Sequence, residues 1–177
     1  MADGGGAQAF DPGQILRVLV THRVNFVLIG GMAAVLYGSP LPTLDVDITP
    51  ERQRDNLARL SNALTELDAR LRADGIDQPL PFGHDADSLA DGGVWNLSTR
   101  YGDLDISMTP SGTSGFADLR RDARAVELYG LSIRVISLAD VIRSKEAAGR
   151  DKDRRVLPVL RELLAERGHD RGGRDRW

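Results

Sequence analysis

Residues 29–50 read IGGMAAVLYGSPLPTLDVDITP and combine two features that a hydrophobic core does not favour. The first apolar strand ends in Gly30-Gly31, although glycine weakens a strand. The second apolar strand contains Asp45 and Asp47, each flanked by aliphatic residues. A carboxylate in such surroundings is costly unless something binds it. The segment therefore predicts a binding site built around a glycine pair and two carboxylates.

The spacing of these two carboxylates predicts a metal site. Side chains two residues apart on a strand share a face, so Asp45 and Asp47 are expected to project together, with Cα atoms about 7 Å apart. A divalent cation between them relieves their repulsion, and Mg²⁺ accepts carboxylate, water and phosphate oxygens. The chain has no cysteine and three scattered histidines, which leaves a hard ion held by carboxylates. The predicted cofactor is Mg²⁺.

The glycine pair predicts a phosphate site beside the metal. Glycines between a strand and a helix let the backbone approach a phosphate, and a helix N-terminus favours its negative charge. Taken alone, the acidic pair also fits a solvated edge strand, and the glycine pair also fits an ordinary turn. Their succession within one short segment favours phosphoryl or nucleotidyl transfer, where positioning and metal charge do most of the catalysis.

The rest of the chain predicts a mixture of helices and strands. Helices are expected at 12–22, 31–39, 51–72, 116–124, 138–149 and from 151 onward, and strands at 24–30, 43–49, 94–100, 103–109 and on both sides of Tyr129-Gly130. Asp11-Pro12, Thr49-Pro50 and Ser137 supply helix-start signals. Residues 74–93 predict a loop with a helical turn near 85–90. This mixture predicts an α/β (α+β) fold with a mixed β-sheet flanked by helices.

Length and charge predict one domain with an uneven charge distribution. The 177 residues suffice for a single domain over 1–168, and a disordered tail is predicted over 169–177. Residues 141–177 hold 11 of the 23 basic and 7 of the 26 acidic residues, a local charge of +4 in a chain of net charge −3. No apolar run approaches the roughly 18 residues of a membrane span, and the N-terminus lacks signal-peptide features. A cytoplasmic protein is expected.

The glycine pair and the Asp-x-Asp segment resemble a known family. Ile29-Gly30-Gly31, thirteen residues and then Asp45-Val46-Asp47-Ile48 resemble the motif of the DNA polymerase beta-like nucleotidyltransferase superfamily. The resemblance covers about residues 24–155 and points to small bacterial minimal nucleotidyltransferases and AbiEii-type toxins. It implies a nucleotidyltransferase-like fold, glycines at a nucleoside triphosphate site and Mg²⁺ on the acidic pair.

Further site residues follow from the resemblance. A third acidic residue on a later strand completes the family's triad, and Asp105, between Leu104 and Ile106, is the candidate. Ser39 is expected near the phosphates. Leu41 lies where members often carry an arginine, which is a departure from the family pattern.

Two lysines are candidates for neutralising phosphate charge. Every other basic residue is arginine, and Lys145 and Lys152 both lie in RSKEAAGRDKDRR, residues 143–155. A lysine is a compact, mobile point charge that suits a triphosphate. In related toxins a lysine and a Lys-Asp pair lie beside the nucleotide, which here match Lys145, Lys152 and Asp153. The alternative is a solvated helix, and Gly149 leaves it open whether the two lysines share a face.

These observations predict a Mg²⁺-dependent nucleotidyltransferase that moves a nucleoside monophosphate from an NTP to an acceptor. The first candidate is a toxin that modifies tRNA or a protein and has a cognate antitoxin. The alternatives are an antibiotic-modifying nucleotidyltransferase with a cationic small-molecule acceptor and a catalytically idle nucleotide-binding module. His84, Trp95 and Tyr101 are expected at the surface or in packing rather than in substrate binding.

Overall fold

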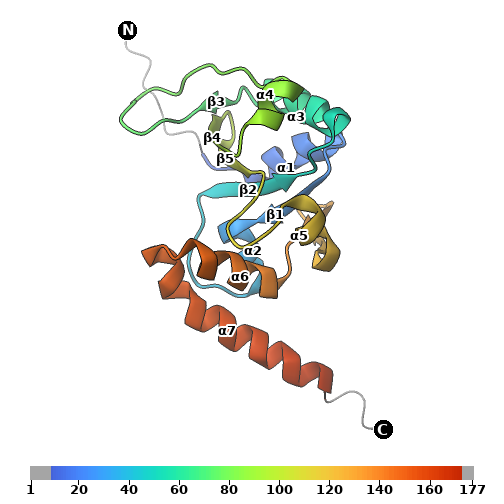
Figure 1. Cartoon of the computed structure of the whole chain (residues 1–177), viewed down its shortest axis with the longest axis vertical. Helices are drawn as coiled ribbons and strands as arrows, with labels where there is room; N and C mark the ends of the chain where they lie inside the picture. The colour runs from blue at the N-terminus through green and yellow to red at the C-terminus, as the bar shows by residue number, and fades with distance from the viewer. Residues whose placement is uncertain (1–8, 173–177) are drawn as a thin grey trace.

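A seven-stranded mixed β-sheet forms the centre of the structure, a computed structural model that describes residues 9–172 (Figure 1). Its strands lie in the order β3-β4-β5-β2-β1-β7-β6. They are β1 (Phe26–Ile29), β2 (Asp45–Pro50), β3 (Arg70–Leu71), β4 (Val94–Thr99), β5 (Gly102–Ser107), β6 (Arg124–Leu128) and β7 (Leu131–Val135). Strands β1 and β7, and strands β2 and β5, pair in parallel, and the other neighbours pair antiparallel. The predicted fold class is confirmed.

The helices form two packed groups around this sheet. The helices are α1 (Pro12–Thr21), α2 (Gly30–Tyr37), α3 (Arg54–Glu66), α4 (Ala86–Asp91), α5 (Phe116–Asp122), α6 (Leu138–Ala148) and α7 (Asp151–Gly172). Helix α3 packs on α1 and α4, whereas α2 packs on α6 and α7. Helix α7 runs away from the rest of the domain (Figure 1). No helix among residues 9–172 is both long and apolar enough to span a membrane.

The central strands divide their side chains between a buried face and the face that carries the carboxylates. All four residues of β1 are buried. In β2, Val46 and Ile48 are fully buried, and the aspartates alternate with them on the other face. Strand β5 repeats this alternation with Leu104 and Ile106. Burial of these aliphatic side chains fixes the register, because a shift of one residue would place the carboxylates in the core.

The segment predicted as one helix, 51–72, is shorter in the structure at both ends. Strand β2 continues through Pro50, and the Thr49 hydroxyl is buried without a hydrogen-bond partner, so it does not cap the helix. Helix α3 begins at Arg54. Its last turn ends at Asp68, which adopts a left-handed conformation (φ 51°) that aspartate tolerates better than most residues.

The other predicted elements agree with the structure within a few residues. Asp11 and Ser137 cap α1 and α6, and α4 occupies the helical turn predicted near 85–90. Gly149, with φ 62°, separates α6 from α7. Helix α7 extends to Gly172, so residues 169–172 are helical where a disordered tail is predicted. Residues 173–177 lie outside the described part of the chain.

Candidate active site

The register of β2 against β5 brings four carboxylates onto one face of the sheet. Asp47 lies opposite Asp105, and Asp45 lies opposite Asp103. Carboxylate oxygens of Asp45, Asp47 and Asp105 all lie within 4.8 Å of one another, close enough to share one metal ion. Asp103 is not part of this cluster. The predicted third carboxylate therefore lies with the Asp-x-Asp pair.

The first glycine of the pair is required by the approach of Asp47. Gly30 has φ 68°, and a Cβ built on it would lie 2.2 Å from Asp47 Oδ2. Beside it, a Cβ on Gly31 would lie 2.8 Å from the hydroxyl of Thr43. Thr43 Oγ1 also donates a hydrogen bond of 2.8 Å to Asp45 Oδ1. The glycine pair thus permits the carboxylates to pack against the start of α2, where a phosphate site is predicted.

The charges of the cluster are poorly balanced without a cation. Burial, followed by the negative charges of Asp45 and Asp105, raises the pKa of Asp47 to about 7. Burial also raises the pKa of Asp105, and the guanidinium of Arg72 opposes that shift. A divalent cation would relieve both the repulsion and the desolvation. The donor set, three carboxylates with no sulfur or imidazole, fits Mg²⁺.

We expect Asp47→Asn to stabilise the metal-free protein at high pH. Because the folded pKa of Asp47 is about 7 and lies above its value of about 3.9 in the unfolded chain, the folded state binds this proton more tightly. The stability that the folded protein gains from binding this proton is complete below about pH 4 and is lost as the pH rises through about 7. The free energy of unfolding falls by at most about 4 kcal/mol over this range, and the variant with asparagine, which does not ionise, keeps its stability.

Urea denaturation in EDTA at about pH 5 and about pH 8 measures this difference. The stability gain of Asp47→Asn over wild type should be larger at the higher pH. Added Mg²⁺ should then stabilise the wild type more than the variant. A variant less stable than wild type at the higher pH contradicts the expected repulsion.

Basic side chains from α6, from α7 and from the junction between these helices line the same space as the carboxylates. Lys145 Nζ lies 3.1 Å from Asp153 Oδ1, and Arg150 Nε lies 2.6 Å from Asp153 Oδ2. Asp153 is fully buried, and this burial by itself raises the pKa of its carboxyl group. The hydrogen bonds and charges of Arg150 and Lys145 outweigh the effect of burial, so the pKa of Asp153 lies below its usual value. Lys152 is exposed, and its charge lowers the pKa of Asp47, which places the lysine close to the cluster.

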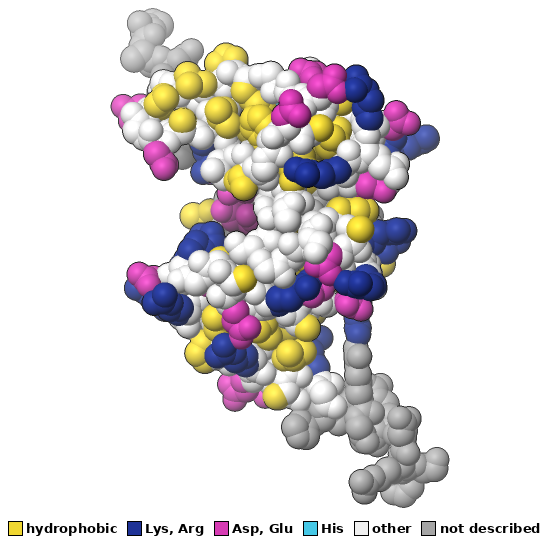
Figure 2. Space-filling view, in the orientation of Figure 1, with side chains coloured by type: hydrophobic (Ala, Val, Ile, Leu, Met, Phe, Trp, Pro, Cys, Tyr) yellow, Lys and Arg dark blue, Asp and Glu magenta, His cyan; other side chains and the backbone are white. Residues whose placement is uncertain are grey.

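One pocket of about 350 Å³ joins these groups. All nine predicted site residues line it: Gly30, Gly31, Ser39, Asp45, Asp47, Asp105, Lys145, Lys152 and Asp153. Figure 2 shows acidic side chains at the narrow waist of the molecule with basic side chains just below them. Leu41, at the position of the family's arginine, lines the pocket as well. The pocket thus combines a carboxylate cluster with cations from another part of the chain.

A second pocket of about 350 Å³ shares two of the three carboxylates with the first. Gly30, Asp47, Asp105, Lys145 and Arg150 line both pockets. The second one continues along β4, the end of β5 and the turn after it, with Asn96, Ser107, Pro110 and Ser111, and is closed on the α6 side by Ser144. The carboxylate cluster therefore lies between two spaces, one on the glycine side and one on the β5 side.

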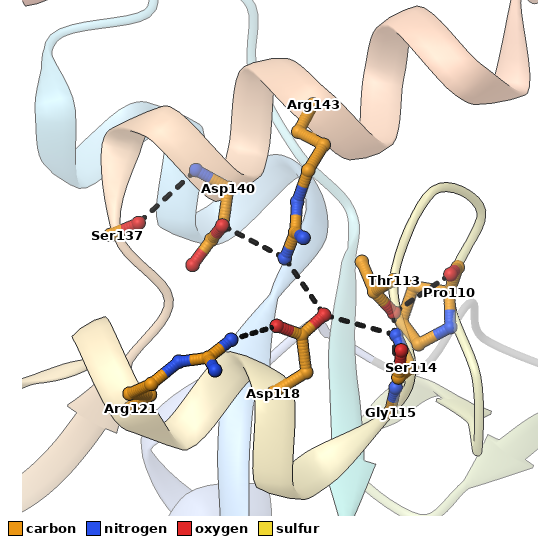
Figure 3. Close-up of polar contacts among 9 residues, drawn as sticks. All are labelled: Pro110, Thr113, Ser114, Gly115, Asp118, Arg121, Ser137, Asp140 and Arg143. Carbon is orange, nitrogen blue, oxygen red and sulfur yellow. Dashed lines mark hydrogen bonds and ion pairs between the residues drawn. The ribbon is translucent and has the colours of Figure 1, made fainter.

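An ion-pair network holds one wall of the second pocket (Figure 3). Arg143 of α6 contacts Asp118 and Asp140, each at 2.9 Å. Asp118 also accepts a hydrogen bond of 3.0 Å from the backbone of Ser114, in the turn that carries Pro110. These contacts connect the 110–115 turn and α5 to α6, and Pro110 of this turn and Ser144 of α6 line the pocket.

Two arginines reach the site without a local sequence signal. Arg72, predicted at the end of a helix, follows β3 and lies 2.5 Å from Asp105 and 3.2 Å from Asp103. Arg150 lines both pockets, although the sequence favours the neighbouring lysines. His84 and Trp95 instead pack around Phe82, away from the pocket lining.

The sheet topology and the carboxylate cluster define a nucleotidyltransferase fold, and solved structures of that class are similar to this chain. The lincosamide antibiotic adenylyltransferase LnuA, in its lincomycin-bound form, is similar over 88% of this chain and 99% of its own, at 16% identity and a TM-score of 0.57. A candidate nucleotidyltransferase from Thermotoga maritima is similar over 90% and 98%, at 20% identity and a TM-score of 0.50. No protein-family model and no curated protein matches the chain. At these identities the likeness establishes the fold.

Proposed function

We propose that this chain is a cytoplasmic, Mg²⁺-dependent nucleotidyltransferase that transfers a nucleoside monophosphate from an NTP to an acceptor. The observation that carries the proposal is the convergence of a three-carboxylate cluster, a glycine pair and two lysines on one pocket of a nucleotidyltransferase fold. A structural role for these groups does not account for three carboxylates packed together with a raised pKa at Asp47.

Each side chain has a distinct task in this proposal. Asp45, Asp47 and Asp105 hold Mg²⁺, which supplies positive charge to the reacting phosphate and the leaving pyrophosphate. The backbone at Gly30-Gly31, with Ser39 nearby, receives the triphosphate. Lys145 and Lys152 neutralise it.

Two further roles are assigned to Asp105 and Asp153. Asp105, on the wall shared by both pockets, takes the proton of the acceptor group as that group attacks the α-phosphate. Asp153 is fully buried between Lys145 and Arg150, so we assign it the role of orienting these cations toward the nucleotide.

We expect alanine at Lys145 or Lys152 to weaken NTP binding or slow transfer by about tenfold to a hundredfold, the usual value of a hydrogen bond to a charged group. Lys152 is exposed, so Lys152→Ala should leave the melting temperature unchanged. Lys145→Ala removes a partner of buried Asp153 and should also destabilise the fold. Arginine at either position should restore activity only in part, because its fork differs from a compact ammonium.

Transfer rates at limiting NTP measure this effect. Arg155→Ala is the matched control, since Arg155 is an exposed basic residue of the same helix and does not line either pocket. Wild-type kinetics in both lysine variants would contradict a role in nucleotide binding and support the alternative, that the two lysines lie on a solvated helix face.

The first candidate for the acceptor is a tRNA or a protein, modified by a toxin that has a cognate antitoxin. The family resemblance and the excess of basic residues after residue 140 support it. Much of that positive charge is engaged within the chain. Ion pairs involve Arg143, Lys145, Arg150, Arg154 and Arg161. A polynucleotide acceptor would therefore meet fewer free cations at this end than the sequence suggests.

A small-molecule acceptor is the second candidate, and the second pocket supports it. Its volume of about 350 Å³ lies within the range of small-molecule sites, and it opens onto the proposed base Asp105. LnuA, with a similar fold, acts on a lincosamide antibiotic. Leu41 lies in the first pocket at the position where the resembling family often carries an arginine, and Arg150 supplies a guanidinium to the same pocket. The presence of this guanidinium favours an enzyme over an idle nucleotide-binding module.

Incubation with each α-labelled NTP and Mg²⁺ tests the proposal. The protein is incubated first alone, then with total RNA, a cell lysate, or a panel of aminoglycosides and lincosamides. Label in RNA, in protein or in a small molecule identifies the acceptor class. Metal-dependent binding of NTP with no transfer to any of them would support the idle module instead.

A further inference from the structure

A separate pocket of about 370 Å³ lies at the opposite end of β1 from the carboxylates. Its lining includes Arg23 after α1, Phe26 at the start of β1, Arg120 of α5 and Arg134 of β7. The carboxylate site lies at the other end of β1, beyond Ile29, and this short strand spans about 10 Å. No residue lines both this pocket and either pocket of the candidate active site.

The three arginines of this pocket are exposed, and their side chains are unpaired within the described chain. None of their guanidinium groups makes a hydrogen bond or an ion pair with residues 9–172. Glu51 is the one acidic residue of the lining, and Asn25 already donates to it at 2.8 Å. The pocket therefore has a formal charge of +2. In contrast, four of the described arginines after residue 140 are paired with carboxylates, namely Arg143, Arg150, Arg154 and Arg161.

Arg23 occupies a position that suits glycine better. The Arg23 and Val24 amides donate to the carbonyls of Val20 and Leu19, at 2.9 and 3.0 Å, which is the hydrogen-bond pattern of a helix end closed by a left-handed residue. Arg23 is that residue, with φ 56°. Glycine adopts this conformation without strain, whereas arginine does not. Despite this strain, the position is occupied by an arginine that lines the pocket.

The remaining lining suits a ligand with a flat or apolar part beside its anion. Phe116 is half-buried and provides apolar surface, Phe26, Val24 and Ile133 form the buried floor beneath it, and Ser132 adds a hydroxyl to the lining. Arginine forks bind phosphate oxygens in bidentate fashion and stack on flat groups. A phosphate monoester carried by a nucleotide matches both the charge and the surface.

We propose that this pocket binds a phosphate group of a nucleotide or of an RNA strand, at a site separate from the catalytic carboxylates. The proposal goes beyond the proposed transfer reaction and does not depend on it. Free nucleotide and RNA offer the same phosphate chemistry, and the experiment distinguishes them.

Binding of three probes to the full chain in EDTA tests the proposal, because metal-free conditions disfavour triphosphate binding at the carboxylates. The probes are inorganic phosphate, AMP and a short single-stranded RNA. The test variants are the double variant Arg120→Gln/Arg134→Gln and the single variant Arg23→Gly. The control is Arg100→Gln, which removes an exposed arginine outside the pocket, and Lys152→Ala reports any binding of a probe in the active-site pocket instead.

We expect the double variant to lose affinity by about tenfold to a hundredfold for at least one probe, and Arg100→Gln to bind like wild type. Arg23→Gly should also weaken binding while its melting temperature stays equal to or above that of wild type, which a structural role of Arg23 does not predict. Tighter binding of RNA than of AMP, with a steep salt dependence, assigns the site to RNA, and the reverse assigns it to a nucleotide. Absence of binding by wild type, equal loss in Arg100→Gln, or loss in Lys152→Ala alone would overturn the proposal.

Discussion

Asparagine in place of Asp45 or of Asp47 is expected to reduce nucleotidyl transfer by about 10³-fold or more while the fold survives. Each change removes one of the three carboxylates that lie within 4.8 Å of one another. Asparagine retains the shape of the side chain but loses the charge that binds a hard cation. Burial and, after it, repulsion raise the pKa of Asp47, and each change relieves at least the repulsion, so the loss of activity should come without a loss of metal-free stability.

Single-turnover transfer with labelled NTP, together with thermal denaturation, separates these effects. Asp55→Asn is a matched control, because Asp55 is an exposed aspartate of α3 that does not line either pocket. Both site variants should also lose Mg²⁺-induced stabilisation. Retained activity together with a sharply lower melting temperature in both variants would mean that the two aspartates have a structural role.

The carboxylate face could be predicted from the sequence because its geometry is local. The two-residue period of a strand places Asp45 and Asp47 on one side, and the burial of Val46 and Ile48 on the other side fixes that choice. The glycine pair was also informative, since the structure leaves no room for a side chain at Gly30 beside Asp47. Helix caps at Asp11 and Ser137 were likewise short-range signals.

The arginines of the site could not be predicted, because long-range contacts place them there. The leucine spacing before Arg72 predicts a continuous helix, but the left-handed Asp68 ends α3 and the chain pairs with β4 as the short strand β3. This pairing turns Arg72 toward Asp105. Arg150 follows the glycine that ends α6, and its direction depends on how α7 packs, which no local pattern specifies.

The assignment of the third carboxylate depends on the difference between Asp105 and Asp103. Both lie on the same face of β5, and both contact Arg72, at 2.5 and 3.2 Å. Only Asp105 joins the cluster with Asp45 and Asp47. The side chain of Asp105 is also less exposed than that of Asp103, 24% against 37%, and burial raises its pKa. The raised pKa of Asp105 suits a base that must take a proton from the acceptor.

We therefore expect Asp105→Asn to slow transfer by about 10²–10⁴-fold, the usual contribution of a general base, while NTP still binds. Asp103→Asn is the matched control two residues away, and it should cost much less, because it removes only a partly exposed contact to Arg72. Rates at saturating NTP, together with nucleotide affinity from equilibrium binding, separate a loss of chemistry from a loss of binding. If Asp103→Asn is the inactive variant and Asp105→Asn turns over normally, the base is Asp103, and the position of Asp105 in the carboxylate cluster has no catalytic meaning.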